Sequence, residues 1–186
     1  MFFLQANQKR LLNSFNPLVM VGFVFLLILI RTTGDAIVPR MLRSWDILLP
    51  VVVYLGQRRS LPEGLILTLF AGHLYSLSSA APIGLFAIHY LLIFVLARLL
   101  SYVTFVSHWY AVVALLFGLG LLAHFSLTVI AAFFGHGWPL FRDFDHVLLQ
   151  AFLNSLFGLV IYSVLNVLDK FTFKVPRINI ELEGEL

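Results

Sequence analysis

Residues 64–97 read GLILTLFAGHLYSLSSAAPIGLFAIHYLLIFVLA, a stretch of 34 residues without a single Asp, Glu, Lys or Arg. As one helix it would be about 51 Å long at ~1.5 Å per residue, well beyond the ~30 Å hydrocarbon core of a bilayer. Its middle, residues 76–84, is rich in small residues and contains Pro82, a combination that breaks helices. The stretch therefore predicts two membrane-spanning helices joined by a tight, uncharged turn.

The composition of the whole chain agrees with this interpretation. Hydrophobic residues make up 61% of the 186 residues and charged residues 11%, whereas ordinary soluble domains carry about 25% charged residues. The absence of cysteine excludes disulfides, thiolate metal sites and cysteine nucleophiles. The net charge of +3 comes from basic residues beside apolar runs, which indicates membrane topology and not nucleic-acid binding.

Polar connections and Pro or Gly stops divide the chain into six apolar segments. We therefore expect an all-α, polytopic membrane protein with one domain over residues 1–186, built as a six-helix transmembrane bundle. Lys9 and Arg10 precede the first apolar run as in a signal peptide, but no A-x-A site follows, so we expect an uncleaved first helix. Residues 169–186 are expected to form a cytoplasmic tail. The expected spans are residues 12–30, 43–56, 62–79, 82–102, 109–134 and 147–168.

Six spans would place both termini on the same side of the membrane. Eight of the twelve Lys and Arg residues flank the spans on that side and four lie on the other. The positive-inside rule then predicts cytoplasmic N- and C-termini, although the first connection, with Arg31, Arg40 and Arg43, argues against it.

Polar residues within the spans are few. His73, His89 and His124 have no mid-span carboxylate as a partner, which favours structural histidines with interhelical hydrogen bonds over a proton relay. Arg98 lies near the end of the fourth span, where it is expected to anchor at the interface; a contact with lipid phosphate or with a partner is the alternative.

Two further groups on the last spans favour helix packing. Asn154 and Asn166 are expected to donate interhelical hydrogen bonds, with a role as substrate ligands as the alternative, and Ala114, Gly118 and Gly120 give a small-residue face for close helix contacts.

No catalytic or cofactor motif is present in the sequence. Metal-ligating residue types occur at His136, Asp143, Asp145 and His146, but their spacing matches no metal motif. Because the sequence also lacks H-E-x-x-H, G-x-S-x-G, P-loop and G-x-G-x-x-G patterns, we expect neither an enzyme nor a metal or cofactor site.

The central hairpin carries a family resemblance. Residues 72–85, GHLYSLSSAAPIGL, resemble the signature of the rod shape-determining protein MreD family, roughly G-l-l-x-D-l-l-s-x-x-p-l-G-l between two apolar spans. Residues 43–59 are similar to the family's second span, with a polar-aromatic entry and a basic turn at Arg58 and Arg59. Ser76 stands where the family usually has an acidic residue, so the role of that acid is not carried over.

The resemblance implies a non-catalytic scaffold in the bacterial inner membrane that contributes to cell shape and directed peptidoglycan synthesis. Its expected partner is an MreC-like bitopic protein, in an assembly with a RodA-type glycosyltransferase, a class B penicillin-binding transpeptidase and, indirectly, the MreB filament. The family's fold is similar to that of the substrate-binding components of energy-coupling-factor transporters. The candidate partner or packing contacts are Gly72, Ser76, Pro82, Gly84, Arg98, Arg58 and Arg59.

A substrate-binding component of a vitamin-type transporter is the alternative function. It requires convergent polar groups inside the bundle and an alanine-spaced face on the first span. The first span, PLVMVGFVFLLILI at residues 17–30, has one Gly and no Ala, which argues against this alternative.

Overall fold

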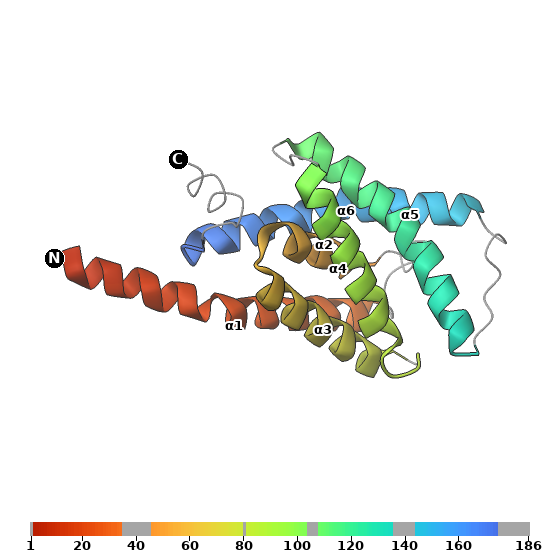
Figure 1. Cartoon of the computed structure of the whole chain (residues 1–186), viewed down its shortest axis with the longest axis horizontal. Helices are drawn as coiled ribbons and strands as arrows, with labels where there is room; N and C mark the ends of the chain where they lie inside the picture. The colour runs from red at the N-terminus through yellow and green to blue at the C-terminus, as the bar shows by residue number, and fades with distance from the viewer. Residues whose placement is uncertain (1, 35–45, 80, 104–107, 136–143, 175–186) are drawn as a thin grey trace.

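The computed structural model describes residues 2–34, 46–79, 81–103, 108–135 and 144–174, and all regular secondary structure in these ranges is helical. The all-helical prediction is therefore confirmed, and Figure 1 shows the helices gathered in one bundle from which the N-terminal part of the first helix extends. The helices are α1 (Phe2–Gly34), α2 (Leu49–Arg58), α3 (Leu61–Ser78), α4 (Leu85–Val103), α5 (Trp109–Phe133) and α6 (Phe144–Phe171).

Four of these helices are long and apolar enough to cross a membrane. The crossing segments are Asn13–Gly34 in α1, Leu85–Tyr102 in α4, Trp109–Phe133 in α5 and Asp145–Phe171 in α6. Only 28% to 39% of each segment is buried, so most of its apolar side chains face outward, as expected for a surface in contact with lipid. The spans expected at residues 43–56 and 62–79 are not among these four, and six membrane crossings remain a prediction.

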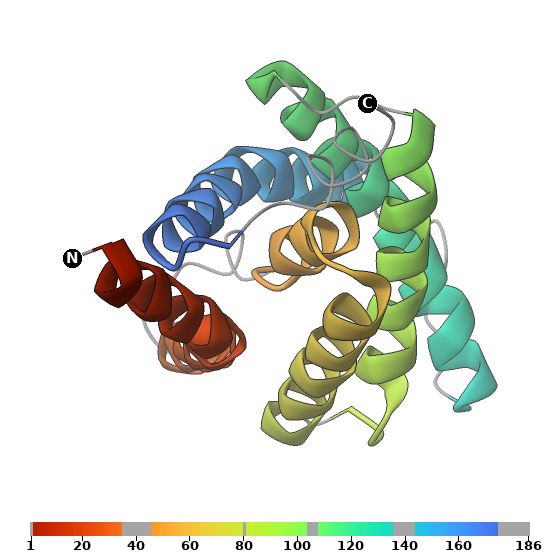
Figure 2. The same cartoon turned by 60° about the vertical axis from the view of Figure 1, so that its left-hand side comes forward.

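Helix α2 lies at the centre of the bundle. Figure 2 shows it between α3, α4 and α6, and nine of its ten residues are buried. The run from Pro50 to Leu55 explains this position, because a helix that is apolar all round is buried most favourably on every side. With ten residues, α2 is about 15 Å long, half the hydrocarbon thickness of a bilayer.

The N-terminal end of α2 is held by side chains from other segments. The Asp46 carboxylate accepts hydrogen bonds from the backbone N–H groups of Leu48 (3.0 Å) and Leu49 (3.3 Å). Tyr90 of α4 donates to the same carboxylate (2.8 Å), and the Asp46 N–H donates to Asn154 Oδ1 of α6 (2.7 Å). Asn154 thus makes a contact between segments as expected, but as an acceptor.

A helical hairpin of α3 and α4 forms with its turn where the sequence predicts it, although α3 is not among the four helices long and apolar enough to cross a membrane. Helix α3 ends at Ser78 and α4 begins at Leu85, with Gly84 between them at a φ of +91°, where side chains are strained. At Gly72, a built Cβ would lie only 2.7 Å from the Cα of Ala87, so the two backbones can approach closely only with glycine there.

Several boundaries differ from the expected spans. Helix α1 begins at Phe2, before residue 12, and α6 runs from Phe144 to Phe171 and not over 147–168. Helix α6 continues through the first residues assigned to the tail, and Asp169 is buried in the bundle, while the cytoplasmic location of the tail stays a prediction. Residues 175–186 lie outside the described residues.

Candidate functional site

A buried polar network joins α1, α2 and α6 near the C-terminal end of α6. The Asp169 carboxylate accepts hydrogen bonds from Asn16 Nδ2 (3.0 Å), the Tyr54 hydroxyl and the Arg59 guanidinium. Asn16 Nδ2 also donates to the Thr172 hydroxyl. These five residues are all buried, so one carboxylate connects three helices away from solvent. We call this group, together with Glu63 and Lys174, the Asp169 network.

Two more charges complete the network. Arg59 Nη1 lies 3.2 Å from the Glu63 carboxylate at the start of α3, and Lys174 Nζ lies 2.9 Å from the other oxygen of Glu63. Two carboxylates thus face two cations, and the formal charges cancel. A cluster with balanced charges and internal hydrogen bonds fixes the relative positions of helices, because breaking the contact of Arg59 with Asp169 leaves an uncompensated charge in an apolar surrounding.

The two arginines of the expected basic turn have different environments. The Arg59 side chain has no exposed surface, which differs from the interfacial contact expected for it, because Asp169 and Glu63 attract it inward. Arg58 is half-buried, and its Nε donates to the Tyr162 hydroxyl of α6 (3.3 Å), which donates in turn to Gln57 Oε1 (2.9 Å).

Asn16 and Asp169 were not predicted from the sequence as parts of a site. Asn16 is an amide within an apolar run, and Asp169 is a carboxylate at the end of another. Each residue was a signal that a polar contact is present, because polar groups in spanning segments usually pair with one another, but neither residue identifies its partner from the sequence.

Arg98 of α4 is also more buried than expected, with only 8% of its surface exposed. Its Nη1 donates to the backbone carbonyl of Gly56 (3.3 Å) and to that of Arg59, at the C-terminal end of α2. The guanidinium therefore caps a helix end where unsatisfied carbonyls concentrate negative charge.

A pocket of about 380 Å³ lies beside Arg98, between the start of α3 and the last turns of α4. We call it the Arg98 pocket. Its lining residues are Leu61, Phe94, Val95, Arg98, Leu99 and Tyr102.

The three histidines of the expected spans do not form a common site. His89 is buried, and its Nδ1 lies 3.0 Å from the Ser126 hydroxyl of α5, which confirms the expected interhelical hydrogen bond. His73 is exposed and His124 is half-buried. Of the remaining metal-ligand types, Asp145 and His146 are exposed.

The described ranges contain no group of three or more His, Asp or Glu residues able to hold a metal ion. His136 and Asp143 lie outside the described residues.

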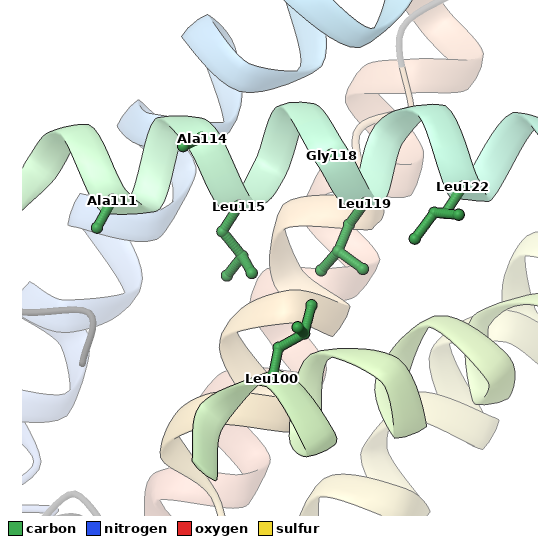
Figure 3. Close-up of a pocket in the computed structure, with 7 residues that line it drawn as sticks. All are labelled: Leu100, Ala111, Ala114, Leu115, Gly118, Leu119 and Leu122. Carbon is green, nitrogen blue, oxygen red and sulfur yellow. The ribbon is translucent and has the colours of Figure 1, made fainter. Parts of the chain in front are cut away.

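A second pocket, also of about 380 Å³, is entirely apolar and lies along α5 (Figure 3). In Figure 3, Leu100 of α4 points toward Leu115 and Leu119 of α5. A Cβ built on Gly118 would meet no atom within 4 Å, whereas one on Gly120 would lie 3.4 Å from Ala151 of α6. The expected small-residue face is thus divided: Gly120 packs inside the bundle, and Gly118 lines what we call the α5 pocket. That pocket is lined by Leu100, Ala111, Ala114, Leu115, Gly118, Leu119 and Leu122.

No family model, no curated protein and no solved structure matches this chain. The functional assignment therefore rests on the residues and their geometry.

Proposed function

We propose that this protein is a non-catalytic scaffold of the bacterial cell-elongation complex, acting in the inner membrane in the manner of MreD-like proteins. It crosses the membrane six times with both termini in the cytoplasm, and it holds the single transmembrane helix of an MreC-like bitopic partner. The glycosyltransferase, the class B transpeptidase and the MreB filament belong to the same assembly, so the protein contributes to cell shape and directed peptidoglycan synthesis without a reaction of its own.

The observation that carries this proposal is the α5 pocket. Ala111, Ala114 and Gly118 are spaced at i, i+3 and i+7, so they share one face of α5. Within lipid, helices associate through close van der Waals packing of small residues, because apolar burial gives no advantage over contact with acyl chains. An all-apolar pocket with an open glycine suits a partner helix that is itself apolar.

The resemblance residues support the same interpretation. Gly72 permits the close contact of α3 with α4, and Gly84 forms the turn between them. Ser76 is buried, and its hydroxyl donates to the Gly72 carbonyl within α3 (3.0 Å). These positions shape the hairpin and offer no reactive group, as a scaffold requires.

The polar groups inside the bundle favour a scaffold over a transporter component. In the described ranges, the charged side chains of the Asp169 network bind one another. Recognition of a vitamin requires polar groups that converge on an open cavity. The α5 pocket, in contrast, is lined only by Leu, Ala and Gly.

Cysteine cross-linking in the native host tests the proposal, because the chain has no cysteine of its own. Ala114→Cys, in the α5 pocket, is expected to form a cross-link to a single-span protein identified by mass spectrometry. Val160→Cys on α6 is the matched control, since its side chain is 61% exposed outside the pocket. Purification without any partner and without a cross-link from Ala114→Cys would refute the proposal, and a stoichiometric bound vitamin would favour the transporter alternative.

A substitution series provides a second, independent test. Gly118→Leu fills the pocket, whereas Gly22→Leu in α1 adds the same side chain at another helical glycine whose Cβ would meet no atom within 4 Å. We expect Gly118→Leu to lower partner recovery and Gly22→Leu to leave it unchanged, as measured by co-purification at equal expression.

A further inference from the structure

Arg98 is a buried cation whose charge is only partly compensated. Both of its hydrogen bonds come from Nη1 and go to backbone carbonyls of Gly56 and Arg59. Among the described residues no carboxylate pairs with Arg98, whereas Arg59 faces both Asp169 and Glu63. Its Nε and Nη2 have no partner in the same ranges, so they remain free to donate to an additional acceptor.

The Arg98 pocket provides space for such an acceptor beside the guanidinium. Fully buried Phe94 lies at its base, while Val95, Leu99 and Tyr102 are 42%, 57% and 64% exposed on the outer side of α4. The pocket therefore opens on the apolar outer surface of the bundle, and one buried guanidinium is its only charged lining group. Its volume of about 380 Å³ is within the range of ligand sites, about 300–1,000 Å³.

The height of the pocket along α4 matches the boundary of a bilayer. Tyr102 is the last residue of the apolar segment Leu85–Tyr102, and tyrosine is enriched at membrane interfaces. Val95 lies seven residues earlier, about 10 Å toward the middle of the helix. A molecule with an anionic head at Arg98 and an apolar chain along Val95 and Phe94 would therefore follow the direction of a lipid.

We propose that the Arg98 pocket binds an anionic glycerophospholipid, with its phosphate accepting hydrogen bonds from Nε and Nη2 of Arg98 and one acyl chain lying along the apolar wall. The planar guanidinium matches phosphate oxygens in a bidentate arrangement. Arg58 and Lys170, at the neighbouring ends of α2 and α6, have no carboxylate partner among the described residues, and their charges favour a lipid with net negative charge.

Native mass spectrometry of the full-length protein in detergent, titrated with phosphatidylglycerol, tests this site. Arg98→Gln removes the cation and is expected to weaken lipid retention about tenfold, the value of one charge-assisted contact. Val95→Trp fills the pocket, so it is expected to weaken lipid retention by exclusion of the acyl chain. Val160→Trp on α6 is the matched control, because it adds the same ring at an exposed position outside the pocket, and it is expected to retain lipid as the unmodified chain does.

Two further ligands identify which part of the lipid is recognised. Diacylglycerol, which lacks phosphate, is expected to bind at least tenfold more weakly, and millimolar inorganic phosphate is expected not to displace the lipid. Equal binding of diacylglycerol, or full displacement by phosphate alone, overturns the proposal.

Unchanged retention in Val95→Trp overturns it as well. Arg98 also binds the C-terminal carbonyls of α2, so Arg98→Gln could prevent folding. Val95 makes no such contact, and Val95→Trp therefore tests the proposal even where Arg98→Gln does not fold. The result is independent of partner cross-linking at Ala114, so failure of either proposal is recognised separately.

Discussion

Removal of the Asp169 carboxylate is expected to destabilise the bundle more than any exposed substitution. Asp169→Ala deletes three hydrogen bonds, from Asn16, Tyr54 and Arg59. Side-chain hydrogen bonds in membrane helix bundles contribute about 0.6 kcal/mol each, so their loss alone costs about 2 kcal/mol. The buried Arg59 then retains only Glu63, and the cost of an incompletely compensated charge raises the total to about 3–4 kcal/mol.

The free energy of unfolding, measured by denaturing-detergent titration of mixed micelles with circular dichroism, checks this value. Asp145→Ala on α6 is the matched control, because the Asp145 side chain is exposed; it is expected to cost less than about 1 kcal/mol. The double replacement Arg59→Met with Asp169→Leu is expected to be more stable than Asp169→Ala, because apolar groups replace both charges. A cost below about 0.5 kcal/mol for Asp169→Ala, within the usual range of a surface change, would refute the reasoning.

Three further substitutions probe the helix contacts. Gly72→Ala places a Cβ 2.7 Å from the Cα of Ala87, and we expect a loss of about 1–3 kcal/mol from overpacking, measured as a lower free energy of unfolding. Gly84→Val forces a β-branched residue to a φ of +91°, and we expect a loss of about 1–3 kcal/mol in the same titration. Ser126→Ala removes the hydrogen-bond partner of His89, and we expect a loss of about 1 kcal/mol together with a changed imidazole resonance in the NMR spectrum.

For each of these predictions, one experimental result would contradict the expected contact. Gly22→Ala is the control for Gly72→Ala, since a Cβ on Gly22 meets no atom within 4 Å; equal stability of the two variants would show that α3 and α4 are not in close contact. Wild-type stability of Gly84→Val would mean that the turn has another conformation. An unchanged His89 resonance in Ser126→Ala would exclude the hydrogen bond between α4 and α5.

The hairpin was predictable from the sequence because its signals are local. The absence of charge over residues 64–97 identifies apolar helices, and Pro82 with Gly84 marks the turn between them. His89 was likewise predictable as a structural residue, since a histidine in an apolar span without a carboxylate nearby favours a neutral hydrogen-bonded state.

The Asp169 network was not predictable in the same way. Asn16 and Asp169 are 153 positions apart, and only the packing of α1 against the end of α6 brings them together. Arg59 follows a basic neighbour in a short connection, a pattern typical of an exposed interfacial turn, and its burial depends on carboxylates from two other helices. Local patterns carry no information about such distant pairing. They also do not show that Gly120 packs against α6 whereas Gly118 lines a pocket.

Helix α2 has a consequence for the order in which the chain assembles during synthesis. At about 15 Å it is too short to insert across a bilayer unaided, and its end groups require partners wherever water is absent. Asp46, which accepts hydrogen bonds from its N-terminal N–H groups, is held by Tyr90 of α4 and Asn154 of α6, and its C-terminal carbonyls are bound by Arg98 of α4. Tyr90, Arg98 and Asn154 are translated only after α2. The nascent α2 segment must therefore wait at the membrane surface or within the insertion machinery until later helices arrive, and chains truncated before α6 should be recognised by quality-control proteases.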